Sequence, residues 1–181
     1  MLKPSIHLLL SSLLAIGLAS PSLAGEEDFE KPVEISSDHQ FADGKEKVSF
    51  LRGNVVIRQG SLLIKADELE IDASQGEGKE VFTAKGSPAS YSQQLDDGQT
   101  VSAKATEITY QLDTRILSLV GSAELIRDTS SVSGGAITFD MINEQLLADG
   151  TGNEDGRVTT VFKPGALPGS KKKEKEEPPA Q

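Results

Sequence analysis

The sequence contains no cysteine and no tryptophan, and aromatic residues make up only 4% of its 181 residues. Without cysteine, an exported chain has to fold without disulfides, and zinc sites built on thiolates are excluded. His39 is the only histidine beyond residue 24, so a zinc site built on several histidines is excluded as well. We therefore predict no metal site and no cofactor, and a core made of Val, Ile, Leu and a few Phe and Tyr.

Basic residues are also scarce. The chain has 18 Lys and Arg against 28 Asp and Glu, a formal net charge of −10. Nucleic-acid binding depends on basic side chains that neutralise phosphates, so this balance argues against a nucleic-acid partner. The same balance argues against simple electrostatic attraction to an anionic membrane surface.

Long apolar runs are limited to one, from Leu8 to Leu18, which follows the basic residue Lys3. Ser22 and Ala24 place small residues where a signal-peptidase cut requires them. We interpret residues 1–24 as a cleavable secretory signal peptide, because an uncleaved membrane anchor would need a longer apolar run. The sequence thus predicts an exported protein that is soluble once cut near Ala24.

The sequence contains few residue clusters that are typical of catalysis. Asp38 and His39 are adjacent on an expected strand, so their side chains point to opposite faces and do not form a base with its orienting partner. Asp67 and Glu68 fit a solvated outer face better than a hydrolytic pair. The acidic stretch 149–156 lacks the glycine and glutamate of a calcium loop and is better read as a turn. We predict no catalytic residue and no enzymatic activity.

What the chain does have is alternation. From Val33 to Phe162, apolar residues alternate with polar ones, which is typical of strands with one buried face. Residues 141–148 are the one stretch that could form a short helix, and we favour a strand there. Residues 25–31 are interpreted as a solvated arm, and residues 164–181 are too rich in Pro, Gly, Ser, Lys and Glu to bury a core. We predict one domain over 25–163 and a disordered charged tail over 164–181.

One β-hairpin pattern occurs three times. Each copy begins at a glycine and closes on a small residue 13, 19 and 13 positions later, and the glycines lie 33 and 35 residues apart, the spacing of stacked repeats. The glycines and their closing residues are Gly53 and Ala66, Gly86 and Ala105, and Gly121 and Gly134. Alternation slips across Arg52 and Gly53, which predicts a bulge or corner in every copy. The longer middle copy carries a hairpin-tip signal at Asp97-Gly98.

Repeated strands without helices predict an all-β, elongated antiparallel sheet that buries one face. The buried face is either an ordinary core closed by a second sheet or an apolar groove that two layers leave incompletely sealed. Alternation alone leaves both interpretations open. Without tryptophan platforms, a groove would suit acyl chains better than sugars.

Several segments resemble the LptA family (OstA-like) of periplasmic lipopolysaccharide transport proteins, over about Val33 to Pro164 and in the same order. They are residues 31–38, 52–60, 64–67, 78–81, 86–89 and 156–161, from Lys-Pro-Val-Glu-Ile-Ser-Ser-Asp to Gly-Arg-Val-Thr-Thr-Val. The resemblance implies a folded-over, V-shaped β-jellyroll with an apolar interior. It also implies a periplasmic adaptor that binds the lipid A part of lipopolysaccharide and bridges inner- and outer-membrane complexes during outer membrane biogenesis.

The partners that the resemblance implies are an inner-membrane-anchored protein of the same fold (LptC-like) and an outer-membrane assembly protein (LptD-like). Edge strands would join them, and two unlike open ends predict head-to-tail self-association. The alternative is an envelope carbohydrate-binding or carbohydrate-active β-repeat protein.

The predicted site residues form two groups. Those of the lipid-binding groove are Val55, Ile57, Ile64, Leu69, Ile71, Tyr91, Ile108, Tyr110, Ile137 and Phe139. Those of the partner edge strands are Val33, Ile35, Val158, Thr160 and Phe162. At residues 90 and 91, where the family often has two aromatics, the sequence leaves open whether Ser90 or Tyr91 faces the groove.

Overall fold

The structure is a computed structural model that describes residue 28 and residues 31–95, 97–152 and 155–162. The predicted signal peptide with its cut near Ala24, and the predicted tail 164–181, lie outside the described residues. Within the described ranges, no helix is long and apolar enough to cross a membrane.

The described chain forms ten strands in one antiparallel sheet, which confirms the all-β prediction. The strands are β1 (Glu34–Ser36), β2 (His39–Asp43), β3 (Val48–Gln59), β4 (Leu62–Asp72), β5 (Val81–Gln94), β6 (Thr100–Gln111), β7 (Ile116–Arg127), β8 (Ser130–Asp140), β9 (Gln145–Asp149) and β10 (Thr159–Val161). The stretch 141–148 for which we favoured a strand contains the turn before β9 and most of β9 itself.

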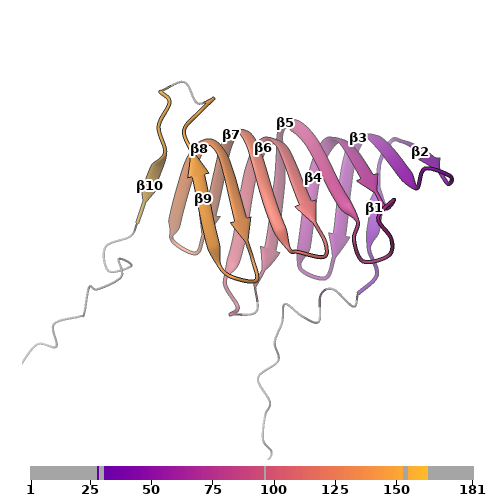
Figure 1. Cartoon of the computed structure of the whole chain (residues 1–181), viewed down its shortest axis with the longest axis horizontal. Coiled ribbons are helices and arrows are strands. Elements are labelled where there is room, and N and C mark those ends of the chain that lie inside the picture. The colour runs from indigo at the N-terminus through magenta and orange to yellow at the C-terminus, as the bar shows by residue number, and fades with distance from the viewer. Residues whose placement is uncertain (1–27, 29–30, 96, 153–154, 163–181) are drawn as a thin grey trace, which may run out of the picture.

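The strands follow one another as a meander. From β3 to β8 each strand pairs with the next along the chain, so hairpins build an elongated row of strands (Figure 1). Both ends of the row are forked, because β1 and β2 both pair with β3, and β9 and β10 both pair with β8.

A line of β-bulges crosses the row. The pairing register shifts between Arg52 and Val55, Lys65 and Glu68, Lys85 and Ala89, Lys104 and Glu107, and Val120 and Ala123. Gly53 and Gly121 have φ of 76° and 81°, a conformation that glycine adopts at no steric cost. The bulges stand where the sequence predicted a corner in each repeat, and they bend every long strand into two limbs.

The two limbs of each strand face one core. In β3, Leu51 precedes the bulge and Val55 and Ile57 follow it, yet all three are buried in the same cluster. The sheet is therefore folded over on itself, and its inner surfaces pack together. Each large aliphatic side chain buried here contributes roughly 1.5–3 kcal/mol, so this core supplies the main stabilisation of a fold without disulfides.

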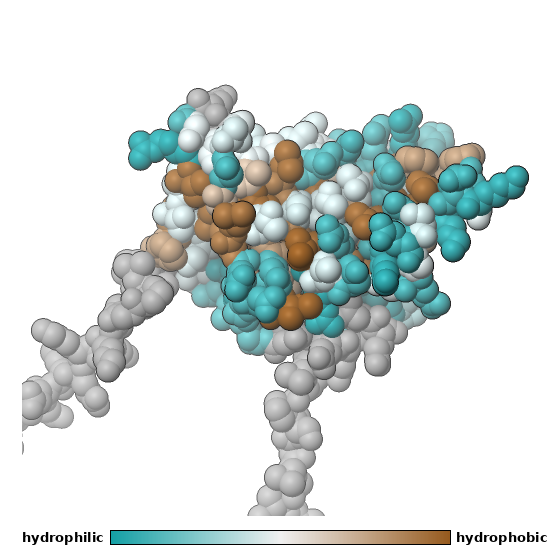
Figure 2. All heavy atoms as spheres, viewed as in Figure 1, coloured by the Kyte–Doolittle hydropathy of each residue, from teal (hydrophilic) through white to brown (hydrophobic). Residues whose placement is uncertain are grey.

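On the face seen in Figure 2 hydrophilic residues are frequent, and apolar residues gather over the end formed by β8 and β9. Two ion pairs lie on the outer surface beside the bulges. Arg52 Nε is 3.1 Å from Glu68 Oε1, and Lys85 Nζ is 3.3 Å from Glu107 Oε2. These pairs are exposed, so each adds less than about 1 kcal/mol of stability.

Asp28 corrects the interpretation of residues 25–31 as a solvated arm. Its side chain is 4% exposed and accepts hydrogen bonds from the Ser61 amide at 2.8 Å, from the Ser61 hydroxyl and from Lys31 Nζ at 2.8 Å. Burial raises the pKa of this carboxyl, but the hydrogen bonds from Lys31 and Ser61 outweigh it and hold the pKa below the usual value. The prediction failed because Ser61 lies 33 residues away in the sequence.

Candidate functional site

The predicted groove residues come together in the interior. Nine of the ten are at most 3% exposed, and Ile71 is half-buried against the same cluster. The nine are Val55, Ile57, Ile64, Leu69, Tyr91, Ile108, Tyr110, Ile137 and Phe139. They come from five strands, β3 to β6 and β8, and β7 adds Leu117, Leu119 and Leu125 to the same cluster, so the apolar interior runs along the row of strands. That they contact lipid stays a prediction.

An apolar crevice of about 20 Å³ opens into the described part of the interior. It is lined by Val33, Ile57, Gln59, Leu62, Ile64, Phe82, Tyr110 and Leu112. This volume holds about one water molecule. Its lining comes from β3 to β6 and from Val33 beside β1, which places the crevice at the N-terminal end. An acyl chain therefore fits only if the two layers move apart.

Two interior tyrosines lie side by side, with ring centroids 6.0 Å apart and an interplanar angle of 50°. Tyr91 faces inward at 1% exposure, whereas Ser90 is half-buried, which answers the question that the sequence left open. The Tyr91 hydroxyl donates a hydrogen bond to the side-chain oxygen of Gln93 and lies 3.6 Å from the Met141 sulfur.

The hydroxyl of Tyr110 is different, because it is buried without a hydrogen-bond partner among the described residues. Burial raises the pKa of Tyr110 to about 12, although the nearby charge of Arg115 acts in the opposite direction. Burial, and then the neighbouring Tyr110, raise the pKa of Tyr91 well above its usual value. Both phenols are therefore neutral at physiological pH, and each can donate one hydrogen bond.

Among the described residues, no group of three or more His, Cys, Asp or Glu side chains is placed to hold a metal ion. His39 is exposed on β2, and Asp38 accepts a hydrogen bond from Asn54 Nδ2 at 2.8 Å. Asp38 therefore supports the Gly53–Asn54 bulge.

The fork at each end gives the molecule four short edge strands. β1 pairs with β3 after its bulge (Ser36 with Val56), and β2 pairs with β3 before it (His39 with Arg52). At the other end, β10 pairs with Ser131–Ser133 of β8, and β9 pairs with Ala136–Asp140. Each layer of the folded sheet thus carries one edge strand at each end.

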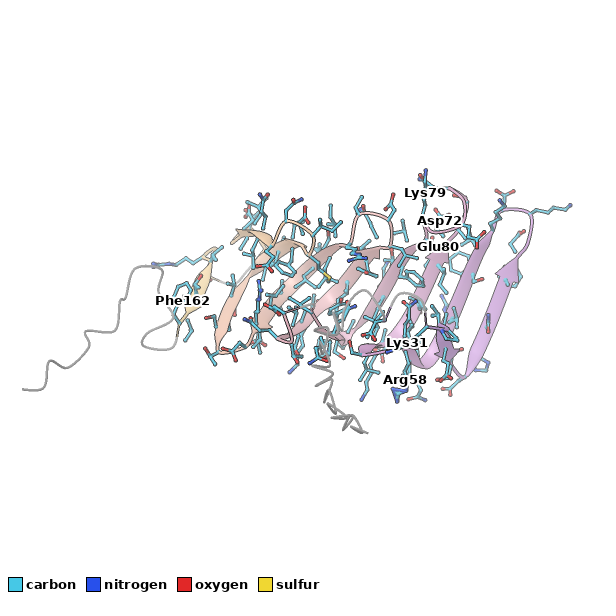
Figure 3. All side chains as sticks on the ribbon, turned by 90° about the horizontal axis from the view of Figure 1, so that it is seen from below. Lys31, Arg58, Asp72, Lys79, Glu80 and Phe162 are labelled. Atoms are coloured by element: carbon cyan, nitrogen blue, oxygen red, sulfur yellow. The ribbon has the colours of Figure 1, made fainter. Side chains whose placement is uncertain are left out.

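The predicted edge residues lie at these ends, and all are exposed. Ile35 is within β1 and Thr160 within β10, whereas Val33, Val158 and Phe162 flank the strands. Figure 3 shows Phe162 beside β10, far along the row from Arg58, which pairs with β1. Each of these strands pairs on one side only, so both are open edges.

The sequence interpretation missed the second pair of edges, β2 and β9. Their large exposed apolar residues are Phe41, 62% exposed, Leu146, 39% exposed, and Leu147, 73% exposed. Phe41 lies opposite Phe50 across β2 and β3, so an apolar pair faces outward at the N-terminal end. The short alternation in 39–43, ending at Asp43-Gly44, was the available signal for β2.

These features define a class: a folded-over antiparallel β-sheet of jellyroll type with an apolar interior and open edges. The profile of the family described as "LptA/(LptD N-terminal domain) LPS transport protein" matches residues 34–145, and the chain belongs to this family.

Relatives extend the match to most of the chain. The chain is 39% identical over 157 residues to the lipopolysaccharide export system protein LptA of Haemophilus influenzae, covering 86% of this chain and 90% of that protein. It is 36% identical to LptA of Escherichia coli K12, covering 99% and 95%. The crystal structure of LptH from Pseudomonas aeruginosa, titled the LptA homologous periplasmic component of the lipopolysaccharide transport device, superposes with a TM-score of 0.68 at 25% identity, covering 76% of this chain and 99% of that one.

Proposed function

We propose that this protein is a periplasmic lipopolysaccharide-transport adaptor whose interior takes up lipid acyl chains. The observation that carries the proposal is the apolar interior, continuous over six strands, in a chain of this family. The relatives named as lipopolysaccharide export system proteins support it. The signal peptide 1–24 would direct the domain 25–163 to the periplasm, with the cut near Ala24.

Transport by this route needs no covalent step and no cofactor. Moving an acyl chain from water into an apolar interior gains about 0.8 kcal/mol for each CH2 group. Part of that gain has to offset the separation of the two layers, because the crevice of about 20 Å³ is too small for an acyl chain. The saccharide part would remain outside, over the hydrophilic outer surface.

The edge strands would join this protein to its partners. We propose that β1 adds to an edge of an inner-membrane-anchored partner of the same fold (LptC-like), and that β10 adds to the outer-membrane assembly protein (LptD-like). Backbone hydrogen bonds supply affinity in such joins, and exposed side chains such as Ile35 and Thr160 supply specificity. Two unlike ends also permit head-to-tail association of copies of this chain.

The test is binding of purified lipopolysaccharide to the processed protein, followed by co-elution in size-exclusion chromatography. We expect the intact lipopolysaccharide to bind and the isolated polysaccharide, freed of its lipid, not to bind. Equal binding of the polysaccharide would overturn the proposal and favour a carbohydrate-binding protein.

A further inference from the structure

The Tyr110 hydroxyl is a buried polar group that the folded chain leaves unsatisfied. Tyr110 is 1% exposed, and its hydroxyl has no hydrogen-bond partner among the described residues. Buried hydroxyls are ordinarily paired, because taking them out of water without a partner is unfavourable. A group of this kind in a native structure needs an explanation.

Tyr91 shows that the interior can satisfy a phenol. Its ring lies next to that of Tyr110 and is equally buried, yet its hydroxyl has Gln93 as an acceptor. Gln93 is itself 3% exposed, so a polar side chain is buried beside Tyr91 for this contact. No described residue makes the corresponding hydrogen bond to the hydroxyl of Tyr110.

The position of Tyr110 indicates what could satisfy it. Tyr110 lines the crevice that remains in the interior, together with apolar neighbours such as Val33, Phe82 and Leu112. The side-chain amide of Gln59, the polar residue of that lining, donates to the main-chain oxygen of Lys31. A chain that enters the crevice therefore meets apolar walls and one donor that lacks an acceptor.

We propose that Tyr110 is a specificity-determining residue that selects acyl chains carrying a hydrogen-bonding oxygen, such as a hydroxyl or an ester oxygen, over unsubstituted chains of the same length. The inference rests on the proposed function, because it requires acyl chains to enter the interior. It goes further by naming the chemical class of chain and the atom that recognises it. The Tyr110 hydroxyl donates the hydrogen bond, and no bond is made or broken.

The first experiment measures selectivity. A fatty acid and its chain-hydroxylated derivative of equal length compete with an environment-sensitive fluorescent lipid for the wild-type protein, for Tyr110→Phe and for Tyr91→Phe. One neutral hydrogen bond corresponds to about a three- to tenfold change in affinity. We expect the preference for the hydroxylated chain to fall by that factor in Tyr110→Phe and to persist in Tyr91→Phe, the matched control.

The second experiment observes the hydrogen bond itself. The chain has two tyrosines and no tryptophan, so in Tyr91→Phe the near-ultraviolet spectrum reports on Tyr110 as the sole tyrosine. We expect the hydroxylated chain to shift this tyrosine band and the unsubstituted chain to leave it in place. If Tyr91→Phe does not fold, the difference spectrum between wild type and Tyr110→Phe gives the same readout.

The outcomes separate the two proposals. If both chains bind the wild type with a ratio that Tyr110→Phe leaves unchanged, and the tyrosine band does not respond, the inference is overturned and the groove stands. If neither chain displaces the fluorescent lipid from the wild type, the groove fails, and the inference fails with it.

Discussion

At the N-terminal end of the sheet β1 and β2 both pair with β3, and at the C-terminal end β9 and β10 both pair with β8. The two forks match even in length, since β1 and β10 have three residues each and β2 and β9 have five. The contacts that finish the two ends nevertheless differ.

The C-terminal side is tied by polar contacts between turns. Arg127, at the end of β7, lies 2.8 Å from Asp97 at the β5–β6 tip and 3.1 Å from Glu144 in the turn before β9. Tyr91 reaches Met141 in that same turn. On the N-terminal side Asp28 holds the β3–β4 turn through Ser61, but the nearby crevice stays apolar and Tyr110 stays unpaired.

The comparison indicates that the polar groups on the C-terminal side are satisfied, whereas the hydroxyl of Tyr110, whose ring lies next to that of Tyr91, is not satisfied by any described residue. Arg127 donates hydrogen bonds to the carboxylates of Glu144 and Asp97, and these bonds raise the pKa of Arg127 further above its usual value. Arg127 therefore stays charged and keeps both contacts at any physiological pH. The unsatisfied hydroxyl belongs to a residue that lines the crevice between β3 and β6, where an oxygen-bearing acyl chain would supply the missing acceptor.

The largest effect is expected from a charge in the interior that both ends share. Ile108→Asp and Ile137→Asp bury a carboxylate without a partner, which costs several kcal/mol if it stays ionised. We expect lipopolysaccharide loading to be lost and the urea midpoint to fall. Thr138→Asp is the matched control, because Thr138 is exposed and adjacent to Ile137. Folded Ile108→Asp or Ile137→Asp proteins that load lipid normally would place these residues in a sealed core.

The next effect tests whether the contacts of Asp28 and the contacts of Arg127 contribute equally to stability. Asp28→Ala removes a buried carboxylate together with the hydrogen bonds that it accepts from Ser61 and Lys31, so we expect a loss of about 1–3 kcal/mol in the free energy of unfolding. Arg127→Ala removes a partly exposed ion pair and should cost less, about 1 kcal/mol or below. Equal losses in urea titrations would contradict the asymmetry.

Lowering the pH tests the contribution of Asp28 to stability in a second way. The folded-state pKa of Asp28 is below its ordinary value of 3.8, so its contribution to stability is complete above that pH and is lost as the pH falls further. Below about pH 4 the wild type should lose stability as the pH falls, and we expect the Asp28→Ala variant to lose less stability over the same pH range. The measurement is the urea midpoint of both proteins as a function of pH. If the midpoint of Asp28→Ala falls with pH as steeply as that of the wild type, Asp28 does not cause the acid sensitivity.

Proline substitutions in the edge strands should show which end of the sheet binds which partner. Ile35→Pro removes a backbone donor from β1 and Thr160→Pro removes one from β10. We expect about a tenfold weaker contact with the inner-membrane partner in the first and with the outer-membrane partner in the second, because roughly one ladder hydrogen bond is lost. Pull-downs with each partner measure this, and Ile35→Ala, which keeps the donor, is the control. A Thr160→Pro protein that loses the inner-membrane partner would reverse the assigned ends.

The sequence predicted what is local in this fold. Each hairpin was visible because its alternation, its turn residues and its glycine (Gly53, Gly86 or Gly121) lie within the same repeat. The forks were not visible, because β1 and β2 share one long strand and only the bulge in β3 separates their pairing. Whether Ser90 or Tyr91 faces inward could not be read, since the register shifts between Lys85 and Ala89, and alternation does not carry across a bulge.

The smallest effect distinguishes the two tyrosines without any ligand. Tyr91→Phe leaves Gln93 buried without its donor, so it should lower the free energy of unfolding by about 1–2 kcal/mol. Tyr110→Phe removes a hydroxyl that has no partner in the described part of the chain, so stability should be unchanged or slightly higher. Urea unfolding of both variants measures the difference between them. A loss at Tyr110→Phe as large as that at Tyr91→Phe would mean that the Tyr110 hydroxyl already has a hydrogen-bond partner without any ligand, and the contrast between the two tyrosines would disappear with it.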